Sequence, residues 1–190
     1  IEKDDKKYNM NSKYKPKDEA KRFASQFQQI KDYAVELVFG FGNGYFPREI
    51  IKMGTSLVRY AFFEPCMESF LYVIKHYDIS DILGSEKVVV FIDGINELEV
   101  GAYLPEMVEW VNLPLMDIAA LPRYKDMYLD LYERYLGNAR EVSARVQMGM
   151  NTWITYAHIR LGNEVQHLHY VLHSNSIDDF KGAFPKKLAA

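Results

Sequence analysis

The stretch VELVFGFGNGY, residues 35–45, decides the fold class of this chain. Its first five residues form a short, mainly apolar run of the kind found in buried β-strands. Glycines follow at alternate positions, Gly40, Gly42 and Gly44, and glycine adopts the backbone angles that a tight turn needs. We therefore predict a buried strand over 35–39 that ends in a glycine-rich turn.

Two further apolar runs follow, and helical patterns separate them. Residues 57–63 (LVRYAFF) end at Glu64, and residues 88–92 (VVVFI) end at Asp93. Strands that alternate with helices and are continuously apolar are typical of a parallel sheet covered on both faces. Because crossovers between parallel strands are right-handed, the two intervening helices should share one face of the sheet, as in one half of a Rossmann-like fold.

Helical patterns dominate the remainder of the chain. We expect a first helix over 16–32, a later one over 104–111 and a fourth strand within 113–121. Beyond residue 122, glycines suggest that one helix ends at Gly137 and the next at Gly162. The helix that starts near Asn138 carries an apolar stripe made of Val142, Val146, Met150, Trp153, Ala157 and Leu161. In the helix that follows Gly162, we expect Val165, Leu168 and Leu172 to face inward.

The predicted fold class is therefore α/β. We expect a Rossmann-like partial parallel sheet of three to five strands with helices on its faces, followed by a mainly helical carboxyl-terminal segment. The predicted domains are residues 1–122, the α/β domain, and residues 123–190, a helical segment leading to a further domain. The ends of the chain suggest that it is part of a longer protein.

Composition narrows the classes of function. The net charge of the 190 residues is −3, and the basic residues near the amino terminus are mixed with acidic ones, which argues against nucleic-acid binding. No apolar run approaches the roughly 20 residues of a membrane span, so we predict no membrane contact. A single cysteine, Cys66, cannot form an internal disulfide and fits a reducing compartment. We predict a cytoplasmic protein.

The glycine turn is the most informative candidate site. A dinucleotide fingerprint of the form Gly-x-Gly-x-x-Gly would need glycine at position 45, where Tyr45 stands, so a standard NAD site is not expected. The spacing Gly-x-Gly-x-Gly instead resembles the first motif of class I methyltransferases, which use S-adenosylmethionine. That resemblance implies that Glu64 would bind the ribose hydroxyls and that Asp93 would lie near the adenine. The candidate cofactor-binding residues are Gly40, Gly42, Asn43, Gly44, Glu64 and Asp93.

Two readings of these glycines stay open. The cofactor is unknown: it could be S-adenosylmethionine or a nucleotide-type ligand, or the turn could bind nothing and merely connect a strand to a helix. Methyltransferases of this class carry an acid two residues before the motif's first glycine, where Val38 stands here, and about seven strands. The sequence predicts fewer strands.

A longer resemblance points to another family. The phrase NSKYKPKDEA, residues 11–20, resembles the "His-Ser-x-Tyr-x-Pro-x-x-Glu-Ala" lead of the motility-associated factor family, bacterial glycosyltransferases that modify flagellin. The glycine turn, then Glu64-Pro65, then DISDIL at 78–83 follow in the family's order, so the resemblance covers about residues 8–94. The family usually has His where Asn11 stands.

This resemblance implies an accessory, non-catalytic Rossmann-like domain that precedes the transferase domain. The implied partners are the downstream transferase domain of the same protein and flagellin. The catalytic residues would lie beyond this chain, so none is assigned here. Two alternatives remain: an S-adenosylmethionine-dependent methyltransferase-like domain, or a protein-interaction module that uses an exposed apolar face around Trp153. His169 and His173 are spaced as metal ligands can be, but we read them as surface residues and predict no metal site.

Overall fold

The computed structural model describes residues 2–3, 6–7, 9, 11–12, 14–27, 30–109 and 111–174. The chain divides into two compact units, Ile1–Gln147 and Met148–Ala190. The boundary expected between residues 122 and 123 falls inside the first unit. The longest helix, α7 (Leu129–His173), contributes its first part to unit 1 and its remainder to unit 2.

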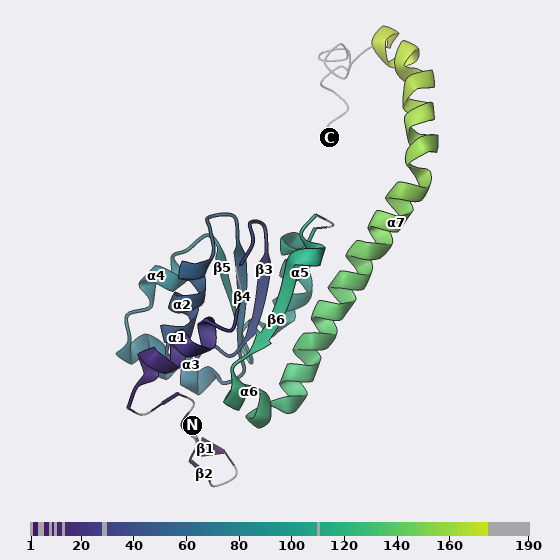
Figure 1. The fold of residues 1–190 in the computed structure, drawn as a ribbon. Helices are drawn as coiled ribbons and strands as arrows, with labels where there is room; N and C mark the ends of the chain where they lie inside the picture. Colours follow the sequence, from purple (N-terminus) through teal and green to yellow (C-terminus); the bar gives the residue numbers. More distant parts are fainter. Residues whose placement is uncertain are drawn as a thin grey trace, which may run out of the picture. The chain divides into compact units, whose positions relative to one another are not determined.

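A four-stranded parallel sheet forms the centre of the first unit (Figure 1). Its strands, in the spatial order β5-β4-β3-β6, are β5 (Val88–Ile92), β4 (Arg59–Glu64), β3 (Val35–Phe39) and β6 (Met116–Ala120). This confirms the predicted α/β fold with a partial parallel sheet. All of β3 is buried, because strands pair with it on both sides and helices cover both faces; this explains its nearly continuous apolar sequence. A separate antiparallel pair joins β1 (Glu2–Lys3) and β2 (Lys6–Lys7).

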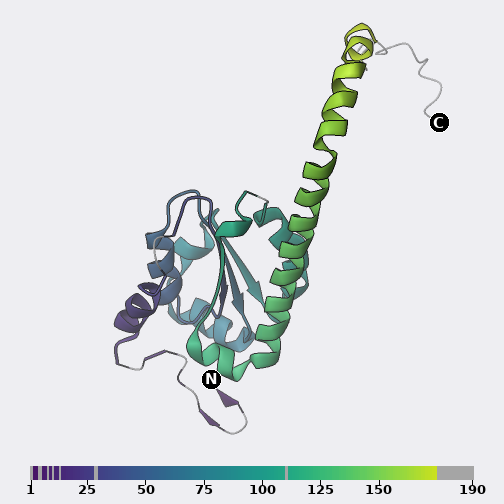
Figure 2. The same ribbon diagram turned by 45° about the vertical axis from the view of Figure 1, so that its right-hand side comes forward.

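Helices cover the two faces of the sheet (Figures 1 and 2). One face carries α1 (Pro16–Ala24), α2 (Tyr45–Met53), α3 (Met67–His76) and α4 (Ser80–Leu83). The other carries α5 (Val100–Met107) and the first part of α7, while α6 (Pro122–Met127) follows the carboxyl end of β6. Short 3-10 turns at Glu97–Glu99 and Leu113–Leu115 precede α5 and β6. The crossover helices α2 and α3 share one face, as right-handed connections require.

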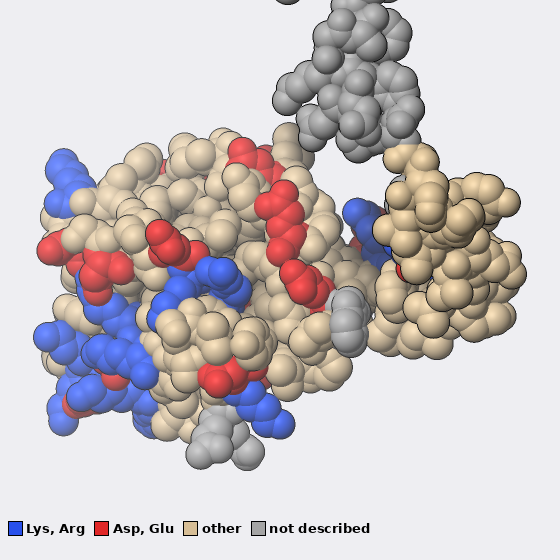
Figure 3. All heavy atoms as spheres, turned by 90° about the horizontal axis from the view of Figure 1, so that it is seen from above, with Lys and Arg blue, Asp and Glu red and all other residues tan. Residues whose placement is uncertain are grey.

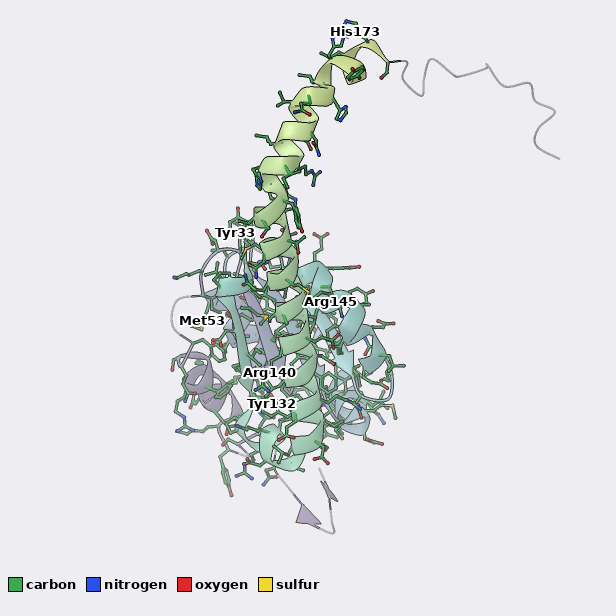
Figure 4. The ribbon with its side chains drawn as sticks, turned by 90° about the vertical axis from the view of Figure 1, so that its right-hand side faces the viewer. Tyr33, Met53, Tyr132, Arg140, Arg145 and His173 are labelled. Atoms are coloured by element: carbon green, nitrogen blue, oxygen red, sulfur yellow. The ribbon has the colours of Figure 1, made fainter. Side chains whose placement is uncertain are left out.

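Aromatic rings pack both faces of the sheet. On the α7 side, the ring of Phe39 stacks on Phe63 at 5.5 Å and meets Tyr132 edge-on at 5.2 Å. The buried Tyr135 hydroxyl donates a hydrogen bond to the carbonyl of Ala61, 3.2 Å away in β4. Figure 4 shows Tyr132 on the part of α7 that belongs to the first unit. These contacts attach the start of α7 to the sheet.

Two predicted helix ends are wrong, since α7 continues through both Gly137 and Gly162. Glycine costs about 1 kcal/mol in a helix interior relative to alanine, which good helix formers on either side can offset. Near Gly137, the buried side chains of Tyr135, Ala139 and Val142 add packing that favours the helix. The helix expected over 16–32 is also shorter. It ends at Ala24, and residues 25–27 form a turn instead of continuing α1.

Candidate functional site

The carboxyl edge of the sheet gathers most of the predicted ligand residues. The glycine turn follows β3, Glu64 ends β4 and Asp93 follows β5, so all three lie at the same edge. The strand order reverses direction between β3 and β6, and open α/β sheets bind ligands at such a switch point. The glycine turn is next to that point.

The carboxylate of Glu64 lies inside the glycine turn. Its Oε2 accepts hydrogen bonds from the backbone N–H groups of Phe41, at 3.0 Å, and Gly42, at 3.4 Å. Its Oε1 accepts a third from the N–H of Cys66, at 3.2 Å. Glu64 is only 1% exposed. The turn's amide groups therefore already bind a carboxyl group that the protein itself supplies.

Tyr124 of α6 closes the same turn from the other side. Its hydroxyl oxygen accepts a hydrogen bond from the N–H of Gly42 at 3.1 Å, and its side chain is fully buried. Burial, followed by the charge of Glu64, raises the pKa of Tyr124 well above the ordinary value of a tyrosine. Tyr124 therefore stays a neutral phenol that completes the hydrogen bonding of the turn.

The environment of Glu64 brings its ionisation close to neutral pH. Burial raises the pKa of Glu64 to about 7, although the hydrogen bonds from Phe41, Tyr124, Cys66 and Gly42 oppose that rise. Desolvation of the charged form therefore outweighs the stabilisation that those donors provide.

The glycines are required by the geometry of the turn. Gly40 has a φ of +102°, and a Cβ atom there would lie 2.8 Å from Cγ of Tyr124. Gly44 has a φ of +82°, and its Cβ would lie 2.9 Å from Cγ2 of Ile79. A side chain at either position would be strained and would collide with its neighbour. These contacts account for the two glycines without a ligand; ligand binding at the turn stays a prediction.

Asn43 and Asp93 have internal partners as well. The side-chain oxygen of Asn43 accepts a hydrogen bond from the N–H of Tyr45 at 3.3 Å, at the start of α2. The carboxylate of Asp93 pairs with Arg134 of α7 at 2.6 Å. The structure thus brings Gly40, Gly42 and Glu64 into one cluster, whereas Asn43 and Asp93 make separate contacts.

Sequence reasoning missed Tyr124 and Arg134 as members of this edge. They lie 82 and 41 residues beyond their partners Gly42 and Asp93. No local pattern could signal these pairings. Cys66, which follows the end of β4, lies beside Glu68, with 3.5 Å between its Sγ and Oε2 of Glu68.

Two hollows of the first unit lie outside the predicted ligand residues. One, of about 190 Å³, lies between α1 and the start of α6, and its lining includes Asn11, Phe23 and Leu121. The other, of about 580 Å³, lies at the amino edge of the sheet, and its lining includes Arg59 and Lys87. Both basic side chains of the second hollow already donate to backbone carbonyls, those of Glu86 and Thr55.

Two histidines of α7, His169 and His173, lie one helical turn apart. The Nδ1 atom of His173 lies 2.7 Å from the carbonyl oxygen of His169, one helical turn earlier. Over the part of the chain that the structure describes, no three His, Cys, Asp or Glu side chains are grouped to hold a metal ion. Over the same residues, no helix has the length and apolar character needed to cross a membrane.

The comparisons with known proteins assign no relative: no protein-family model, curated protein or solved structure matches this chain.

Proposed function

We propose that this chain is the non-catalytic accessory domain of a bacterial glycosyltransferase of the motility-associated factor type, acting in flagellin glycosylation in the cytoplasm. The proposal that the domain is non-catalytic rests on one observation. The backbone amides of the glycine turn bind the carboxyl group of Glu64 and the hydroxyl of Tyr124. The proposal that the chain belongs to the motility-associated factor family rests on the order of the motifs at 11–20, 38–45, 64–65 and 78–83.

The occupied turn leaves little for a cofactor to bind. In nucleotide-binding sheets, the N–H groups of this turn point at an anionic group of the ligand. Here a ligand would have to displace a carboxylate held by three backbone N–H groups. It would also have to move the Tyr124 ring, which lies against Gly40. The sheet has four strands, whereas a complete methyltransferase of the resembled class has about seven.

An accessory domain acts through contacts with protein rather than through chemistry of its own. The proposed partners are the downstream transferase domain and flagellin. A cytoplasmic location agrees with the single cysteine, Cys66, whose thiol is free in the structure.

Calorimetric titration of the 190-residue chain tests the proposal. S-adenosylmethionine, S-adenosylhomocysteine and a uridine-diphosphate sugar should each give no binding heat at ligand concentrations up to about 1 mM. Micromolar binding of an adenosyl ligand to the unaltered chain would overturn the non-catalytic assignment. If that binding is lost in Glu64→Gln but kept in Glu133→Gln, an exposed glutamate of α7, the glycine turn is its site.

A separate assay of sugar transfer tests the proposed membership of the glycosyltransferase family. Incubated with flagellin and a labelled nucleotide sugar, this chain should transfer no label, whereas a longer protein containing it should do so. Transfer by the 190 residues themselves would contradict an accessory role.

A further inference from the structure

The part of α7 in the second unit carries an unusual number of exposed apolar side chains. Ten large ones between Met148 and Leu172 are 48–70% exposed. They are Met148, Trp153, Ile154, Tyr156, Ile159, Leu161, Val165, Leu168, Tyr170 and Leu172. In Figure 3 most of the surface of this segment belongs to uncharged residues. Exposed apolar surface of this extent marks a binding surface.

Seven apolar positions in this segment are spaced symmetrically about Leu161. Apolar residues lie 4, 7 and 11 positions away from it in both directions along the chain. The set, which we call the symmetric stripe, is Met150, Ile154, Ala157, Leu161, Val165, Leu168 and Leu172. An 11-residue repeat corresponds to about 3.67 residues per turn, close to the α-helical period, so the stripe keeps to one face over roughly 33 Å.

The charges of the segment suit pairing with an identical chain. Between residues 148 and 173 the sequence has one Lys or Arg residue, Arg160, and one acidic residue, Glu164. They form an ion pair within the helix at 3.1 Å. Arg160 also lies over the ring of Trp153, 5.8 Å from its centroid. A second copy alongside would therefore meet no excess of like charge.

We propose that the symmetric stripe pairs with the same stripe of a second copy of this chain, antiparallel, about a two-fold axis at Leu161. This arrangement places Met150 opposite Leu172 of the other copy, Ile154 opposite Leu168 and Ala157 opposite Val165. A two-fold interface requires each residue to meet its partner reciprocally, which the symmetric spacing satisfies.

The exposed stripe side chains supply the area that a specific dimer needs. If each of the ten large exposed ones in the pair, Ile154, Leu161, Val165, Leu168 and Leu172 of each copy, loses roughly 100 Å² of accessible surface, the pair buries roughly 1,000 Å², the size that a specific interface should reach. The inference stands on residues 148–173 alone. It is therefore independent of the proposed function, and its failure would leave the result of the ligand titration unchanged.

Light scattering coupled to size exclusion tests the proposal on the 190-residue chain. At about 50 µM, the chain should elute with twice its mass of 22.1 kDa. Leu161→Glu places two carboxylates at the axis and should give the monomer mass, with at least a tenfold rise in the dissociation constant. Ile159→Glu is the matched control: residue 159 is exposed but lies about 200° around the helix, so the dimer should persist.

The other outcomes of this experiment overturn the proposal. A monomer in the unaltered chain at 50 µM excludes the second copy as occupant. Co-sedimentation of that monomer with phosphatidylcholine vesicles would then identify a lipid surface instead. Equal dissociation by both glutamate variants would show that the symmetric stripe is not the contact face. Far-ultraviolet circular dichroism of each variant shows whether its helices are intact.

Disulfide trapping tests the antiparallel register. In a Cys66→Ser background, Leu161→Cys should cross-link to itself across the two-fold axis under mild oxidation. Met150→Cys should not, because its counterpart in the other copy is Leu172, but Met150→Cys combined with Leu172→Cys should. Self-linking of the single Met150→Cys variant would indicate parallel pairing and contradict the proposed geometry.

Discussion

Oε2 of Glu64 lies 3.0 Å from the backbone nitrogen of Phe41, so the last residue of β4 supplies a carboxyl group to the turn after β3. The two residues are 23 positions apart. The parallel pairing of β3 with β4, in which Phe39 is opposite Phe63, brings them together. An internal carboxylate thus holds the position that a ligand's anionic group takes in nucleotide-binding sheets of this type.

Truncating Glu64 should destabilise the first unit. Glu64→Ala leaves the buried N–H groups of Phe41, Gly42 and Cys66 without their acceptor, which should lower the free energy of unfolding by about 3 kcal/mol. Glu64→Gln keeps an acceptor oxygen and should cost about 1 kcal/mol. Urea unfolding measures both. Equal losses for Ala and Gln would mean that the acceptor oxygen kept in Gln does not replace the carboxylate. The exposed Glu133→Ala variant provides the baseline.

Glu36 should make the stability of the fold dependent on pH. It is 4% exposed, and its Oε2 has no hydrogen-bond partner among the described residues. Burial, followed by the charge of Asp117, raises the pKa of Glu36 from 4.5 to about 7. The folded state therefore holds the proton more tightly than the unfolded state, and stability should fall as pH rises from about 4.5 to about 7. The loss above pH 7 should reach about 3 kcal/mol.

Glu36→Gln isolates this contribution. The variant should be more stable than the unaltered chain at pH 8 and should show a weaker decline between pH 5 and pH 8 by urea unfolding. Some decline should remain, because burial also raises the pKa of Glu64 to about 7. An unchanged pH profile would show that Glu36 does not titrate in this range.

Gly40→Ala should disrupt the glycine turn. The new Cβ would lie 2.8 Å from the Tyr124 ring at a φ of +102°, so we expect a loss of at least about 2 kcal/mol in thermal or urea unfolding. The matched control is Gly137→Ala, within α7, where a Cβ meets nothing within 4 Å. That substitution should stabilise the helix by about 0.5–1 kcal/mol. Destabilisation by Gly137→Ala would contradict a continuous α7.

The ion pair between Asp93 and Arg134 should contribute little. Its side chains are 31% and 54% exposed, and ion pairs in such positions are worth about 0–1 kcal/mol. A double-mutant cycle with Asp93→Asn and Arg134→Gln should give a coupling energy below about 1 kcal/mol that decreases in 1 M sodium chloride. A coupling well above that value would assign the pair a role in holding α7 on the sheet.

The local sequence was sufficient to predict the bounds of β3 and β5. The observed bounds of β3 and β5 match those predicted, because each is a short apolar run ended by a residue that favours a turn, Gly40 or Asp93-Gly94. The shared edge of the glycine turn, Glu64 and Asp93 also followed from strand order, since carboxyl ends of parallel strands meet at one edge. The fold class and the placement of these residues at one edge of the sheet could thus be predicted.

Tertiary contacts decided what surrounds that edge. The sequence alone could place Glu64 near the turn, but not show that its carboxylate points inward, because that depends on Tyr124 from a distant helix covering the turn. Similarly, Gly137 was expected to end a helix from its local preference of about 1 kcal/mol, which the packing of Tyr135 and Ala139 on the sheet outweighs. Local patterns determine which segments become strands, whereas interactions between distant residues determine where helices end and which polar groups remain free for a ligand.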